Sequence, residues 1–161
     1  MRRVVVLGRG GAGKSVLARR LGGLTGLPVV ELDRYFWGEG LERMSPGRWA
    51  VVQAGLARED RWIMDGDLGP YDVPEVRLRR ADTVVVLDFP FWLCAWRAGL
   101  RGWERADFWR WVWGYRRRSL VALMAVVARE AGGARVVVLR GKGGVRRFLG
   151  EVGAGSEPGG Q

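Results

Sequence analysis

A glycine-rich stretch near the start of the chain constrains the fold more than any other feature. It reads Gly8, Arg9, Gly10, Gly11, Ala12, Gly13, Lys14 and Ser15, after an apolar run and before a segment with helical periodicity. Glycines let the backbone curl so that its N–H groups form a nest for phosphate oxygens. At this spacing the lysine reaches the β- and γ-phosphates of a triphosphate, the serine hydroxyl ligates Mg²⁺, and the helix dipole favours anions. The stretch therefore predicts a P-loop in which all eight residues bind ATP, Lys14 also acts in catalysis and Ser15 holds Mg²⁺.

The same glycines fit a second motif. Gly8, Gly10 and Gly13 satisfy G-x-G-x-x-G, the dinucleotide fingerprint, and Glu31 and Asp33 stand about 20 residues further on, where that motif places an acid. Lys14 and Ser15 directly after the last glycine decide against it. A pyrophosphate bridge needs no lysine there, whereas a triphosphate with Mg²⁺ uses both side chains.

The length and composition indicate one domain. The chain has 161 residues, of which 48% are apolar, enough for a core. It has one cysteine and no histidine, so an internal disulfide and a histidine-based catalytic triad are excluded. The longest later apolar run, residues 120–128, is shorter than the ~20 residues that a membrane helix needs. We expect a cytoplasmic monomer without a membrane segment.

The chain carries a net charge of +10, and all of its 27 basic residues except Lys14 and Lys142 are arginine. This charge fits an anionic ligand such as phosphates or nucleic acid, but it also fits arginines spread over solvated faces. The total charge alone does not separate these two interpretations.

Strand-like and helix-like segments alternate along the chain. We expect strands near 4–7, 29–32, 61–65, 83–88 and 135–139, and helices at 14–24, from Ser45, after Pro90, at 120–131 and near 145–152. This order predicts a three-layer α/β P-loop NTPase fold with a largely parallel five-stranded sheet, of the nucleoside or nucleotide kinase type. The domain should span residues 1–152, followed by a disordered tail at 153–161.

Within these helices, specific residues should face the core. We expect Leu17, Leu21 and Leu24 to face the sheet from the first helix, and Trp92, Leu93, Trp96 and Leu100 to form the buried face of the helix after Pro90. Tyr35, Phe36 and Trp37 follow the second strand, and they either cap the core or lie beside a ligand.

Aspartates end several of the expected strands. Asp88 ends an apolar strand expected at the centre of the sheet, which matches the Walker-B role of orienting Mg²⁺. Asp33 should end a strand beside the P-loop strand. Asp65 and Asp67 flank the end of the third strand, and the sequence leaves their roles open.

Arginine and tryptophan interleave over residues 101–118. Such a segment can form a short lid whose arginines clamp phosphates, and we expect Arg105 and Arg110 to act in this way. It can also bind single-stranded nucleic acid, or form an amphipathic helix with a solvated arginine face.

Four stretches together resemble a bacterial family related to adenylate kinase, often labelled topology modulation protein. They are Gly8–Ser15, Glu31-Leu32-Asp33, Trp62-Ile63-Met64-Asp65-Gly66 and Leu87-Asp88-Phe89-Pro90. The resemblance implies an adenylate-kinase-type core, ATP with Mg²⁺, and phosphoryl transfer to a small acceptor. It also implies that Asp33 faces the acceptor hydroxyl or the metal. The family often has asparagine where this chain has Asp67.

Two hypotheses for function follow. The first is an ATP-dependent kinase of a small, nucleotide-like or nucleoside-like molecule. The alternative is a nucleotide-dependent regulator that binds nucleic acid through the Arg/Trp segment. A GTPase is disfavoured because guanine selection there uses Asn-Lys-x-Asp and this chain has no asparagine.

Overall fold

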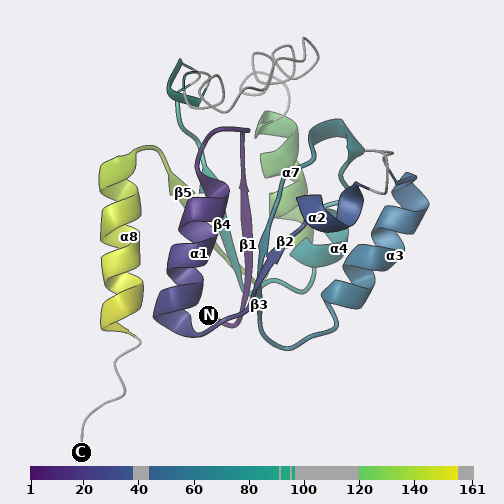
Figure 1. Cartoon of the computed structure of the whole chain (residues 1–161), viewed down its shortest axis with the longest axis horizontal. Coiled ribbons are helices and arrows are strands. Elements are labelled where there is room, and N and C mark those ends of the chain that lie inside the picture. The colour runs from purple at the N-terminus through teal and green to yellow at the C-terminus, as the bar shows by residue number, and fades with distance from the viewer. Residues whose placement is uncertain (38–43, 91, 95, 97–119, 156–161) are drawn as a thin grey trace, which may run out of the picture.

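The computed structural model describes residues 1–37, 44–90, 92–94, 96 and 120–155. Its elements are β1 (Arg3–Gly8), α1 (Lys14–Thr25), β2 (Val29–Glu31), α2 (Asp33–Phe36), α3 (Pro46–Leu56), β3 (Trp62–Asp65), a 3₁₀ turn (Gly69–Tyr71), α4 (Glu75–Leu78), β4 (Thr83–Leu87), α7 (Leu120–Glu130), β5 (Arg135–Leu139) and α8 (Lys142–Ala154). The strands form one sheet in the order β2-β3-β1-β4-β5 (Figure 1).

Every strand pairing among the described residues is parallel, with β1 at the centre. Its register places Val6 opposite Asp65 of β3 and Gly8 opposite Leu87 of β4. Parallel strands end at the same edge of the sheet, so the P-loop and the residues after β3 and β4 meet there. This confirms the expected α/β fold.

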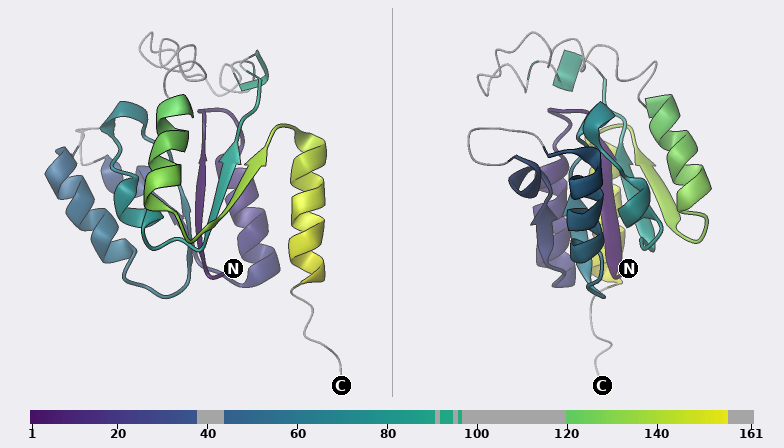
Figure 2. Two further views of the ribbon diagram at one scale, coloured as in Figure 1. Left: turned by 180° about the vertical axis from the view of Figure 1, so that it is seen from behind. Right: turned by 90° about the vertical axis from the view of Figure 1, so that its right-hand side faces the viewer.

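The side chains of β1 alternate between two cores because successive residues of a strand point to opposite faces. Val4 and Val6 pack under α1 and α8, whereas Val5 and Leu7 pack under α2, α3, α4 and α7. The two views of Figure 2 show α1 and α8 on one face of the sheet and α7 on the other. The molecule therefore has the three layers that the sequence predicts.

The start of α3 follows the sequence signal. Ser45 is the N-cap and accepts a hydrogen bond from the backbone N–H of Arg48, and Pro46 takes the first helical position. Trp49 is fully buried on this helix, and so is Gln53, which the apolar pattern did not single out.

Three expectations about packing are wrong. Trp92 and Trp96 are 69% and 65% exposed rather than core, because Cys94 between them is the residue packed against the P-loop. Leu24 is 42% exposed and turns toward Gly153 of α8 instead of the sheet. Leu100, expected on the same face as the two tryptophans, lies outside the described residues.

The end of α8 also differs from the expectation. The helix reaches Ala154, so the first two residues of the expected tail are helical. Phe148 and Val152 are buried against α1 and the sheet, and this packing carries the helix past residue 152. Residues 156–161, the rest of that tail, lie outside the described part of the chain.

Candidate active site

The P-loop lies between β1 and α1 and has the backbone that its glycines permit. Gly8, Gly11 and Gly13 have φ of 141°, 78° and 94°, in the region that side chains disfavour. A Cβ at Gly8 would lie 2.7 Å from the carbonyl oxygen of Leu87, and one at Gly11 would overlap the carbonyl oxygen of Cys94. These glycines are therefore needed both for the curl of the loop and for its close contact with the chain after β4.

Lys14 and Ser15 form the first turn of α1, with Gly13 as the N-cap. The Nζ of Lys14 lies 3.5 Å from the carbonyl oxygen of Arg9, so the lysine folds back over its own loop. The Ser15 hydroxyl lies close enough to the Asp65 carboxylate to lower the pKa of Asp65. The cation and the hydroxyl expected at a phosphate site thus stand together at a helix N-terminus, where anions are favoured.

Asp65 ends β3 beside the P-loop strand and is only 4% exposed. Its Oδ1 has no hydrogen-bond partner among the described residues. Burial raises the pKa of Asp65, while the nearby Ser15 hydroxyl and the Lys14 charge oppose the shift. A buried carboxylate oxygen without a partner, next to a serine hydroxyl, is the hard oxygen donor set that Mg²⁺ prefers. These two residues therefore fit the metal that the P-loop pattern implies.

Asp33 lies in the same region, although its element differs from the expectation. We expected it to end a strand beside the P-loop strand, but β2 ends at Glu31 and pairs with β3, and Asp33 begins α2. The chain turns into a helix here because the carbonyl of Leu32 accepts hydrogen bonds from Tyr35 and Phe36.

The electrostatic surroundings of Asp33 show which groups share its side of the site. The pKa of Asp33 is raised, first by the protein that desolvates it and then by the charges of Asp65, Asp72 and Glu31, against the pull of Lys14. Asp33 is solvent-exposed as a residue, so the surrounding protein removes only part of its hydration. An exposed carboxylate with a raised pKa, close to the P-loop lysine, is a suitable base for a hydroxyl.

Glu31, close to Asp33 in the sequence, forms ion pairs with two arginines. Its carboxylate lies 3.4 Å from Arg19 and 2.8 Å from Arg34, so it links α1 to α2.

The aromatic residues after Asp33 were expected either to cap the core or to lie beside a ligand, and the structure divides them between these positions. Phe36 is buried edge-on against Trp49, while Tyr35 and Trp37 are 44% and 43% exposed beside Asp33.

Asp88 lies on the other side of β1 from Asp65, directly after β4. One of its carboxylate oxygens is 3.7 Å from Nε of Arg140, which follows β5. The structure thus offers two aspartates at strand ends beside the P-loop strand. Ser15 contacts Asp65, and the metal assignment of Asp88 stays a prediction.

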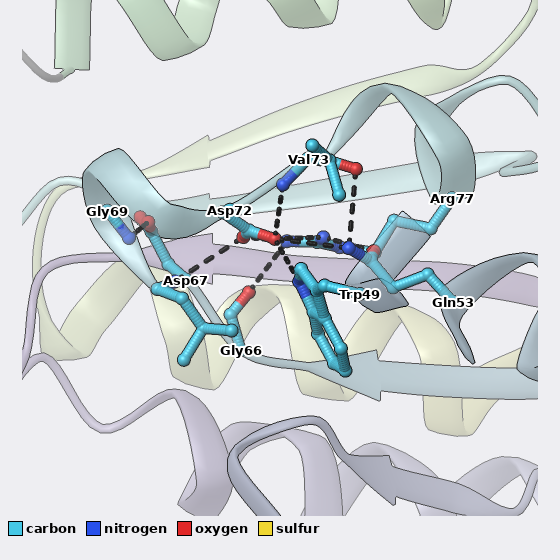
Figure 3. A network of polar contacts seen from close by, with 9 residues as sticks. Trp49, Gln53, Gly66, Asp67, Gly69, Asp72, Val73 and Arg77 are labelled. Atoms are coloured by element: carbon cyan, nitrogen blue, oxygen red, sulfur yellow. Dashed lines mark hydrogen bonds and ion pairs between the residues drawn. The ribbon is translucent and has the colours of Figure 1, made fainter. Parts of the chain in front are cut away.

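A buried polar cluster lies behind the segment that follows β3, and the sequence analysis missed it (Figure 3). The Arg77 guanidinium and the Asp72 carboxylate form a two-pronged ion pair, with N–O distances of 2.9 and 2.6 Å. Trp49 and Gln53 of α3 also donate hydrogen bonds to Asp72. In the sequence Arg77 is one of many arginines. The only signal that could have pointed to a buried polar partner is Gln53, which stands four residues after Trp49 and so shares the buried face of α3.

A cavity of about 660 Å³ opens beside the P-loop, between α1 and the start of α8. It is lined by Gly11, Ala12, Gly13, Val16, Leu17, Arg20, Leu87, Phe89, Lys142, Val145 and Arg146. Its walls are mainly apolar with three cations among them, and its size lies in the range of small-molecule sites, roughly 300–1,000 Å³.

The remaining expected site residues, Arg105 and Arg110, lie outside the described residues, as does the whole segment 101–118. In the part of the chain that the structure describes, no group of three or more acidic or cysteine side chains could hold a metal alone. A metal at Ser15 and Asp65 would therefore complete its shell with phosphate oxygens and water.

None of the described helices is long and apolar enough to cross a membrane.

No protein-family model matches the sequence, and no curated protein sequence matches it significantly. Solved structures do match the fold. A shikimate kinase from Acinetobacter baumannii in complex with shikimate has a TM-score of 0.63 and 18% identity, over 94% of this chain and 90% of that one. A gluconokinase from Sinorhizobium meliloti 1021 has a TM-score of 0.56 and 16% identity, over 96% and 90%.

A sugar kinase from Janibacter sp. HTCC2649 matches with a TM-score of 0.55 and 20% identity, over 96% of this chain and 91% of that one. All three proteins are small-molecule kinases, and each match spans nearly the whole of both chains. At identities this low, the structural matches are evidence for the fold alone. The chain has an α/β P-loop NTPase fold of the kind found in these kinases.

Proposed function

We propose that the protein is an ATP-dependent phosphotransferase that moves the γ-phosphoryl group of ATP to a hydroxyl of a small molecule. The observation that carries the proposal is the meeting of Lys14, Ser15, Asp65 and Asp33 at one edge of the sheet. A phosphate cradle alone would fit any nucleotide-binding protein. A kinase needs, in addition, a base on the acceptor side of the phosphate site, and Asp33 would supply it.

In the proposed reaction the P-loop N–H groups and Lys14 hold the β- and γ-phosphates. Mg²⁺, when bound by Ser15 and Asp65, neutralises charge on those phosphates. Asp33 accepts the proton of the acceptor hydroxyl while that oxygen bonds to the γ-phosphorus and the bond to the β–γ bridging oxygen breaks. ADP leaves with the negative charge that Lys14 stabilises. Positioning and electrostatics supply most of the catalysis in this chemistry.

The cavity beside the P-loop supports a nucleoside at the donor end. It borders Gly11, Ala12 and Gly13 on the side away from Asp33 and offers apolar walls such as Phe89 and Leu87. The acceptor would then lie across the γ-phosphate, near Asp33 and the exposed rings of Tyr35 and Trp37. A role for Arg105 and Arg110 as phosphate clamps stays a prediction. The topology modulation assignment, the monomeric state and the cytoplasmic location also stay predictions.

The acceptor is best sought in a direct screen. Nucleosides, nucleotides, sugars, sugar acids and shikimate-like alcohols are each mixed with ATP and Mg²⁺, and acceptor-dependent ADP release is measured. Lys14→Ala is the matched negative control, because Lys14 should contact ligand rather than core and its loss should leave circular dichroism unchanged. Full turnover in a folded Lys14→Ala protein would contradict the site. ATP binding without turnover on any acceptor would favour the nucleotide-dependent regulator.

A further inference from the structure

The ion pair between Asp72 and Arg77 is sealed from solvent, with side chains that are 3% and 0% exposed. Burial acts to raise the pKa of Asp72, yet the Arg77 charge and the hydrogen bonds from Arg77 and Trp49 hold it below its ordinary value. Arg77 also donates to the side-chain oxygen of Gln53 at 2.6 Å. The pair is therefore ionised and fixed in place.

Both partners of this pair extend to the backbone that follows Asp65. Nη2 of Arg77 donates to the carbonyl oxygen of Gly66 at 3.0 Å, and the N–H of Leu68 donates to Asp72 at 3.4 Å. Figure 3 shows this backbone segment converging on the pair. Because Gly66 is the next residue after Asp65, the Arg77 bond restrains the chain directly beside the metal-site carboxylate.

The same segment also touches the chain that leads to Asp33. Gly66 has φ of 158°, and a Cβ built on it would lie 2.8 Å from Cβ of Leu32. The N–H of Leu32 donates to the carbonyl oxygen of Asp65 at 2.9 Å. Leu32 is the residue before Asp33. A continuous set of contacts thus joins Arg77 to Gly66, Gly66 to Leu32, and Leu32 to the start of α2.

We propose that Asp72 and Arg77 form a positioning unit that sets the Asp65 carboxylate against Ser15 and Asp33 against the γ-phosphate. The proposal rests on the function proposed above. Neither residue touches the substrate in this scheme. They act through Gly66 and Leu32, so the metal carboxylate and the base move as one unit.

A purely stabilising role explains the pair less well. Buried ion pairs often contribute little net stability, because the loss of hydration offsets the attraction between the charges. Arg77 even leaves its Nε without a hydrogen-bond partner among the described residues. Arg79 lies two residues after Arg77 in the chain. It pairs with Glu130 at the same N–O distance of 2.6 Å, but its side chain is 65% exposed. That surface pair provides a matched control.

The test replaces the whole pair by apolar side chains, as Arg77→Met with Asp72→Leu, so that no unpaired charge stays buried. The control is Arg79→Met with Glu130→Leu. We expect the pair variant to need ~10- to 100-fold more Mg²⁺ for half-maximal ATP binding, the usual range for groups that orient metal ligands. Its affinity for ATP in EDTA should stay within twofold of the parent. The control variant should match the parent in both measurements.

An unchanged Mg²⁺ requirement in the folded pair variant would overturn the proposal. An equal loss of Mg-ATP and metal-free ATP affinity would also overturn it, since general loosening gives that result. If the double variant does not fold, Arg77→Lys replaces it. Lysine keeps the charge but cannot bind Asp72 with two nitrogens and Gly66 at once, so the same shift in Mg²⁺ requirement is expected.

Failure of the proposed function would look different. It would appear in the parent as ATP binding without turnover on any acceptor, which leaves the Mg²⁺ titrations of the pair variant interpretable. Hydrogen exchange then decides the structural claim without any catalysis. The amides of Leu32 and Gly66 should exchange faster in the pair variant than in the parent and the control. Equal exchange in all three proteins would overturn the positioning role.

Discussion

Asp33 carries its charge where the fold disfavours ionisation. The surrounding protein and three nearby carboxylates raise its pKa, so the native state binds a proton at Asp33 more tightly than the unfolded chain does. Above the raised pKa the ionised carboxylate therefore lowers the free energy of unfolding, and below its ordinary value of 3.8 the penalty is absent. Because ionised Asp33 destabilises the fold, we expect this carboxylate to act in the proposed phosphoryl transfer.

Asp33→Asn should separate these two effects. The variant should lose roughly 10²- to 10⁴-fold in acceptor-dependent turnover, the usual loss for a general base, and keep ATP affinity within a few-fold. Its thermal stability at pH 7 should equal or exceed that of the parent, and the difference should vanish as the pH falls through the Asp33 range. Turnover assays and melting curves from pH 3 to 8 measure both. Normal turnover with the true acceptor would show that Asp33 is not catalytic.

Asp65 and Asp88 are the two candidate metal ligands, and one pair of variants decides between them. Because the Ser15 hydroxyl lies beside Asp65 and Arg140 lies beside Asp88, Asp65→Asn should raise the Mg²⁺ requirement for ATP binding more than Asp88→Asn does. Ser15→Ala should behave like Asp65→Asn, with little change in metal-free ATP affinity. Titrations of ATP with Mg²⁺ and with EDTA supply the comparison. The reverse order would return the metal role to Asp88.

At the scale of single elements, two leucines near the C-terminal end of α1 test how helix faces are assigned. Leu21 is fully buried between α1 and the sheet, whereas Leu24 is 42% exposed, although both fit the same apolar stripe. Leu21→Ala should cost about 2–5 kcal/mol of stability, the range for a buried leucine. Leu24→Ala should cost well under half as much, which urea unfolding can measure. Similar losses for the two variants would mean that Leu24 is more buried in solution than its position on α1 indicates.

The elements also show what sequence patterns can and cannot predict. The glycine turn between β1 and α1 was predictable because its spacing is local in the sequence, and Ser45-Pro46 was predictable because capping is a local interaction. The exposure of Trp92 and Trp96 was not predictable, since it depends on Cys94 packing against Gly11, far away in the sequence. Arg77 was missed for the same reason. Its partners come from α3 and from the chain after β3, and no local pattern separates it from solvated arginines.

At the scale of the whole molecule, the order of the strands was the part of the fold that reasoning from the sequence misplaced. Alternating strands and helices predicted the layers and the parallel sheet, but β3, not β2, lies beside β1. The position of Asp33 as the end of a neighbouring strand was therefore wrong, although the Lys14 charge still acts on its carboxylate. Strand order depends on contacts between distant segments, which periodicity does not encode.

The overall charge of +10 gives a prediction that concerns the rival function. Any binding to nucleic acid should be non-specific, weaken steeply between ~50 and ~200 mM salt, and be unaffected by Lys14→Ala. ATP binding should depend on Lys14 and change less over the same salt range. Fluorescence titrations of labelled oligonucleotide and nucleotide measure both. Sequence-selective binding that persists at high salt would favour the regulator.

The central position of β1 has a consequence for the order in which the protein can become active during synthesis. The phosphate loop is complete at residue 15, but both strands that flank β1 come much later, with β4 ending at Leu87. At 5–20 residues per second, the ribosome needs roughly 4 to 14 s to pass from Ser15 to Leu87. During that time the nascent chain carries every residue of the phosphate cradle without the neighbours that shape it. Nucleotide binding by this loop, as proposed above, therefore has to wait until β4 has been synthesised.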